Sequence, residues 1–170
     1  RELRLQKPSQ PYIRPKMPAA VLATSSQPYK VWPETKGPEA SSRSVYIHVK
    51  RSIQLPLLSA FDAPQRDISC PTRFATTVPT QTLTMLNSGF VNQRAAIFAT
   101  ELEKQYPTQA SQQLNHGFQL ATGRAATEEE LTELRKLQQD LISEYKLTPS
   151  TSLARICLLL LNLNETLYLD

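Results

Sequence analysis

The chain has 170 residues with 40% hydrophobic content, which suits one domain or one and a half. The longest apolar run, residues 156–161, is far too short to span a bilayer. Residues 1–75 hold 12 Lys and Arg against 5 Asp and Glu, whereas residues 76–170 hold 7 against 10. A basic arm and an acidic body indicate that the arm docks on the body or on an anionic partner.

Prolines dominate the beginning of the chain. Residues 1–44 contain prolines at positions 8, 11, 15, 18, 28, 33 and 38. This spacing leaves no room for a long helix or a central strand, so we predict an extended arm. One short helical turn is expected over 19–24, because a proline at position 18 can open it. Tyr12, Tyr29 and Trp32 are the expected anchors of the arm.

Residues 44–52 show the alternation of a half-buried strand. Val45, Ile47 and Val49 alternate with polar side chains at the intervening positions. We predict one strand here, paired with the arm or with residues 53–58. A short helix is expected to begin at Pro56 and to end in a turn over 61–64.

From residue 76 onward the apolar residues recur with helical spacing. The helices are expected over about 76–87, 89–106, 108–122, 128–145 and 149–161. Pro107 ends the second of these helices, and Gly123 suits the C-terminal cap of the third. Thr127 and Glu130 form a capping box. The last helix is apolar on most sides and is expected at the centre of the bundle.

The predicted fold is therefore mainly α and forms a single domain over 1–170. A bundle of four to five helices covers 76–170, and the extended arm, 1–75, wraps it with one or two short strands.

The two cysteines and two histidines define no catalytic group. Cys70 and Cys157 form no Cys-x-x-Cys motif, which excludes zinc-finger and thiol-redox sites of that type. Cys157 is expected to be a small buried side chain, and a disulfide with Cys70 stays open. Neither His48 nor His116 has a marked nucleophile and orienting group beside it, so the sequence leaves open whether the chain is an enzyme.

Several motifs together resemble one family. They lie at 17–28 (MPAAVLATSSQP), 43–52 (RSVYIHVKRS), 61–64 (FDAP), 70 and 73, 76–83 (TTVPTQTL), 86–87 and 161–170 (LNLNETLYLD). In this order they resemble a planctomycete-specific C-terminal domain family of unknown function. Members of that family follow another uncharacterised domain and, in many cases, a planctomycete cytochrome c-like domain.

The resemblance implies a cellular context rather than a reaction. It implies an extracytoplasmic protein of the periplasm or cell envelope, and the preceding domains of the same polypeptide as partners. The first residue is Arg1 and no signal segment follows it, so we expect a piece of a longer protein. The haem-attachment motif Cys-x-x-Cys-His is absent, so no cofactor is expected in this chain, and any haem would lie on an upstream domain.

A set of polar residues inside these motifs is the candidate site. Its members are His48, Lys50, Arg51, Asp62, Arg66, Arg73 and Glu165. One interpretation is a cleft between arm and helices that binds an anionic or sugar ligand, with arginine holding carboxylate or sulfate. The other is an internal network in which Arg51 and Arg73 pair with Asp62 and Glu165. Asn162 and Asn164 are expected to cap the last helix rather than to bind a metal ion.

Two functions follow from these interpretations. The first is a non-catalytic structural or interaction domain, and the second is a ligand-binding or accessory catalytic domain for envelope or sulfated polysaccharide. Aromatic residues interleave with basic ones in the arm, as in a nucleic-acid groove. The charges are scattered rather than clustered, however, so no nucleic-acid partner is expected. An aromatic pocket with open polar groups would favour the ligand, and internally satisfied polar groups would favour the scaffold.

Overall fold

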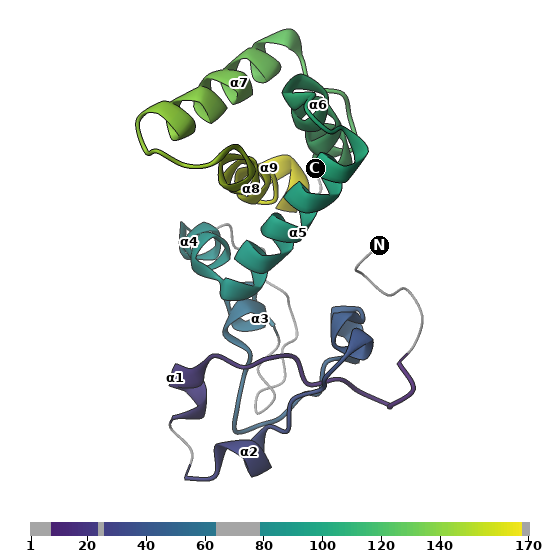
Figure 1. Ribbon diagram of the computed structural model, residues 1–170. Coiled ribbons are helices and arrows are strands. Elements are labelled where there is room, and N and C mark those ends of the chain that lie inside the picture. Colours follow the sequence, from purple (N-terminus) through teal and green to yellow (C-terminus); the bar gives the residue numbers. More distant parts are fainter. Residues whose placement is uncertain (1–7, 24–25, 64–78, 168–170) are drawn as a thin grey trace. The chain divides into compact units, whose positions relative to one another are not determined.

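The computed structural model describes residues 8–23, 26–63 and 79–167 (Figure 1). The chain divides into two compact units, Arg1–Thr76 and Thr77–Asp170. The described residues are mainly helical with almost no strand structure, which confirms the predicted fold class. How the first unit is placed on the second stays a prediction.

Short helices that begin beside prolines build the N-terminal unit. They are α1 (Ala19–Leu22), α2 (Pro28–Val31), two 3₁₀ turns (Pro38–Ser41 and Ser44–Tyr46) and α3 (Pro56–Ala60). Proline suits the first helical position because its missing N–H would be unpaired there in any case. The turns expected after Pro18 and from Pro56 are confirmed as α1 and α3. The α2 helix was not predicted, because its proline was interpreted as a break rather than as a start.

The predicted strand over 44–52 is wrong. Residues 44–46 form a 3₁₀ turn, and only Ile47 makes a β-bridge to the arm, with Ile13. The Ile13 N–H donates to the Tyr46 carbonyl at 2.8 Å, and Ile13 in turn accepts from the His48 N–H at 2.7 Å. Val45 and Val49 are 77% and 60% exposed, so the apolar alternation does not mark one buried face.

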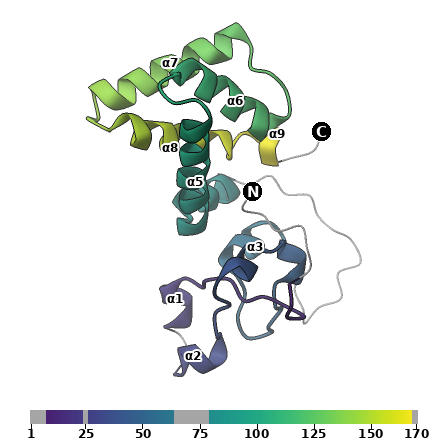
Figure 2. The same ribbon diagram turned by 45° about the vertical axis from the view of Figure 1, so that its right-hand side comes forward.

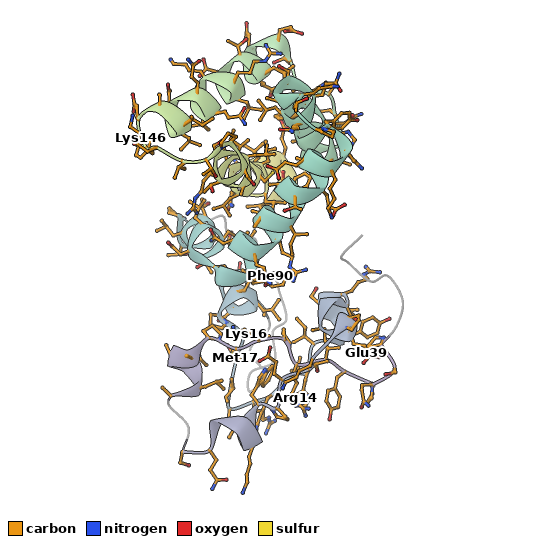
Figure 3. All side chains as sticks on the ribbon, in the orientation of Figure 1. Arg14, Lys16, Met17, Glu39, Phe90 and Lys146 are labelled. Atoms are coloured by element: carbon orange, nitrogen blue, oxygen red, sulfur yellow. The ribbon has the colours of Figure 1, made fainter. Side chains whose placement is uncertain are left out.

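The core of the N-terminal unit consists of a few large side chains. Met17 (labelled in Figure 3), Trp32 and Ile53 are buried together, and Leu55 is among the half-buried residues that pack against them. The indole N–H of Trp32 donates to the Pro15 carbonyl at 2.8 Å. Trp32 therefore anchors the arm internally, as predicted for an aromatic residue of this segment.

Over residues 79–167, six helices form the C-terminal unit. They are α4 (Pro79–Asn87), α5 (Gly89–Gln105), α6 (Ala110–Thr122), α7 (Glu128–Ser143), α8 (Pro149–Leu160) and α9 (Asn164–Leu167). Figure 2 shows α8 beneath α7 and crossing α5, and α8 contacts α5, α6 and α7. Ile156 and Cys157 on α8 are fully buried, which confirms its central position. The α9 helix was not predicted.

Capping explains where these helices begin and end. The side chains of Ser88, Thr127 and Thr148 each accept from a backbone N–H of the first turn that follows. Thr127 and Glu130 form the predicted capping box. Gly123 ends α6 with φ +81°, a left-handed conformation that favours glycine. The helix predicted over about 128–145 ends at Ser143, so Tyr145 lies beyond it and is 69% exposed.

Candidate functional site

The structure separates the predicted site residues. His48, Lys50, Arg51 and Asp62 belong to the N-terminal unit, whereas Glu165 belongs to the helical unit. Arg66 and Arg73 lie outside the described residues, as does Cys70. The cleft between arm and helices therefore stays a prediction, and each group is described within its own unit.

His48 packs against two aromatic rings. Its ring centroid is 4.6 Å from that of Tyr12 and 6.0 Å from that of Trp32. The guanidinium of Arg14, which Figure 3 labels, lies over the Tyr12 ring, 4.5 Å from its centroid. The residues after Pro11, the residue that follows α2 and the residues after the second 3₁₀ turn thus bring a cation and three rings together.

The other polar residues near His48 are oriented by the unit itself. The Lys50 ammonium donates to the Val31 carbonyl at 2.9 Å, which joins the residues after the second 3₁₀ turn to the end of α2. Arg51 and Asp62 are exposed. Asp62 has φ +55°, in the turn predicted after α3.

Glu165 belongs to an ion-pair cluster of the helical unit. Arg124 NH2 lies 3.0 Å from Glu165 Oε1 and 2.6 Å from Glu130 Oε1, and its guanidinium covers the Phe118 ring at 4.8 Å. Hydrogen bonds from Arg124, with the Thr127 backbone N–H second, lower the pKa of Glu130 to about 2. Hydrogen bonds to Glu130 and Glu165 also raise the pKa of Arg124. The cluster joins the α6–α7 loop, the start of α7 and α9.

A pocket opens beside His48 within the N-terminal unit. Its volume is about 190 Å³. We call it the Trp32 pocket, and its lining residues are Trp32, Ile47, His48, Val49, Ile53, Gln54, Leu55, Leu58, Ser59 and Ala63. Sequence reasoning missed the pocket because it assigned 44–52 to a strand. The available signal was the density of apolar residues between positions 47 and 58.

Comparison with known protein families identifies the family of the chain. The model of the family described as Protein of unknown function (DUF1553), PSD1, matches residues 4–138. The chain belongs to this family. The match covers the described part of the N-terminal unit and the helices α4 to α6, and it ends within α7. The motif at 161–170 that carried part of the resemblance lies outside the matched residues. No curated protein and no solved structure is significantly similar to the chain.

The helical unit of this DUF1553 chain holds the remaining chemically interesting side chains. Burial raises the pKa of the Cys157 thiol to about 12, so the thiol is protonated at neutral pH and is a poor nucleophile. His116 packs against the edge of Tyr106, with centroids 5.4 Å apart. The Asn162 side chain donates to the Leu158 carbonyl at 2.6 Å and so satisfies a carbonyl at the end of α8.

In the parts of the chain that the structure describes, no three His, Cys, Asp or Glu side chains are grouped to hold a metal ion. Among those same residues, no helix combines the length and the apolar character that crossing a membrane requires.

Proposed function

We propose that this DUF1553 chain is a non-catalytic structural and interaction domain of a larger extracytoplasmic protein. The observation that carries the proposal is the internal pairing of polar side chains within each unit, including the candidate residues Lys50 and Glu165. The Lys50 ammonium donates to Val31, the Trp32 indole donates to Pro15, and Glu165 pairs with Arg124. A site built for a polar ligand keeps such groups open toward the ligand, whereas an interaction domain uses them to fix its own surface.

The wider context in this proposal comes from the family resemblance. It supports a multidomain protein that also carries a cytochrome c-like domain, with any haem on that domain. It also supports the preceding domains of the same polypeptide as partners, and a location in the periplasm or cell envelope.

One observation favours the second candidate, a domain that binds envelope or sulfated polysaccharide. Tyr12 is 38% exposed and carries the Arg14 guanidinium on its ring. A partly exposed ring beside an arginine can stack on a sugar and pair with its sulfate. Among the described side chains of this unit, Tyr12 is the one exposed ring, which is why we rank the interaction domain first.

The experiment that tests the proposal measures two kinds of binding to the purified chain. The first is binding of the preceding domain of the same polypeptide, produced separately, by calorimetry. The second is the melting temperature with sulfated and neutral oligosaccharides, since a ligand of the folded state raises it by mass action. Saturable binding of the preceding domain without a sugar effect supports the proposal. A dose-dependent rise with one sugar class that Tyr12→Ala abolishes would establish the second candidate.

A further inference from the structure

The Trp32 pocket has the size of one ring-bearing side chain. Its volume is about 190 Å³. A cavity of about 150 Å³ lined by apolar side chains is large enough to hold benzene. Trp32 and Ile53 form buried parts of the wall, and Leu58 contributes from α3. The pocket is therefore large enough for an aromatic ring and too small for a chain of sugars.

The chemistry of the wall favours an apolar occupant. Besides the rings of Trp32 and His48, most of the wall is aliphatic. Its polar residues include Gln54 and Ser59, and the Ser59 hydroxyl donates to the Gln54 side-chain oxygen at 3.4 Å. A sugar placed here would lose hydrogen bonds to water without regaining them, which is unfavourable. An aromatic ring would instead gain contacts with Trp32 and His48.

The charged residues around the pocket indicate the charge of the segment that would carry the inserted ring. Lys50 and Arg51 directly follow the wall residue Val49, which is itself 60% exposed, and Asp62 directly precedes the wall residue Ala63. Residues 8–63 hold seven Lys and Arg against three Asp and Glu. An acidic segment is attracted to such a surface, and an exposed valine at the rim provides further apolar contact around the inserted ring.

We propose that the Trp32 pocket receives an aromatic side chain from an acidic segment of a protein partner. This inference rests on the proposed function, because it specifies how the interaction domain holds its partner. Val49 and the aliphatic wall would lose their remaining exposure to water in the complex. Arg51 would face the acidic residues that flank the inserted ring, whereas the Lys50 ammonium keeps its bond to the Val31 carbonyl.

The test uses the only tryptophan of the chain as a reporter. The indole N–H signal of Trp32 is followed by NMR while acetyl-Asp-Phe-Asp-amide is added to the purified chain at millimolar concentrations. The matched peptides carry alanine in place of phenylalanine, or lysine in place of aspartate. Ser59→Phe fills the pocket from α3, and Ser59→Ala is its control. Both variants are first shown to keep the dispersed amide spectrum of the folded chain.

We expect the acidic phenylalanine peptide to shift the Trp32 signal in the native chain and in Ser59→Ala, but not in Ser59→Phe. The alanine peptide should bind at least about tenfold more weakly, since it lacks the buried ring. No shift with any peptide, or a shift that persists in Ser59→Phe, overturns the inference. Equal binding of the lysine peptide overturns its acidic part, and binding of free benzyl alcohol without any peptide binding overturns the protein partner. Binding of the preceding domain is a separate measurement, so failure of the pocket and failure of the proposed function are distinguishable.

Discussion

The two units of the chain achieve order in different ways. In its described part, the helical unit buries a continuous core of 13 residues between helices of up to 17 residues. The N-terminal unit has helices of at most five residues, and its buried cluster is formed by Met17, Trp32 and Ile53. Its backbone is instead held by individual hydrogen bonds between distant segments, such as the one that the Thr35 N–H donates to the Arg14 carbonyl at 2.8 Å. A small core concentrates stability in a few side chains, whereas a large core distributes it.

The largest expected effect comes from Trp32→Ala. The substitution removes the largest side chain of the small core and the hydrogen bond from the indole to the Pro15 carbonyl. We therefore expect the free energy of unfolding to fall by about 3–5 kcal/mol. Hydrogen exchange should show lost protection over 8–63 and retained protection over 89–160. Loss of protection in both ranges together would show that the two units unfold as one.

A comparable substitution in the helical unit should lower its stability without disrupting its fold. Ile156→Ala removes a fully buried side chain from α8, with an expected loss of about 3 kcal/mol. Since many contacts remain around it, the unit should still melt cooperatively, at a lower denaturant midpoint. A molten helical unit, with poorly dispersed amide signals, would contradict the view that its core distributes stability.

The ion-pair cluster predicts a pH dependence of the helical unit. The pKa of Glu130 is lowered in the folded state, so its stabilising effect is present above the pKa of about 4.3 expected for an unfolded glutamate. The effect should be lost as the pH falls from there toward 2. Denaturant unfolding between pH 5 and 2 should show a steeper fall in stability for the native chain than for Glu130→Gln. Glu133→Gln, on an exposed position of α7, is the matched control and should behave as the native chain.

The smallest effect concerns the end of α7. Lys146, labelled in Figure 3, has φ +56°, which is unfavourable for a side chain with a Cβ atom. Lys146→Gly relieves this strain but increases the freedom of the unfolded chain. We expect a net gain of about 0.5 kcal/mol, visible as a small rise in melting temperature. A decrease in melting temperature would mean that the Lys146 side chain stabilises the fold by more than its left-handed conformation destabilises it.

The same contrast explains what could be predicted from the sequence. Local signals determine the helical unit: Val91, Ala95 and Leu102 repeat with helical spacing, and the Thr127 capping box marks a helix start. The N-terminal unit depends on pairings between distant residues, such as Ile13 with Ile47. No local pattern encodes such a pairing, so the alternation at 44–52 was mistaken for a strand.

The candidate site was only partly predictable for a related reason. Its residue types were selected for charge, and Lys50 and Glu165 indeed make specific polar contacts. The partner of Glu165 is Arg124, which lies 41 positions earlier in the sequence and was not selected. The Trp32 pocket is formed by apolar side chains, a class that a search for polar chemistry passes over.

The burial of Cys157 makes the modification rate of its thiol a measure of how often the helical unit opens. Its side chain is fully buried and its thiol stays protonated, so a thiol reagent can modify it only while the surrounding helices are open. In a Cys70→Ser background, the modification rate at saturating reagent would equal the opening rate of this region. That rate determines how long the helical unit resists a protease between openings, a property that equilibrium stability alone does not give.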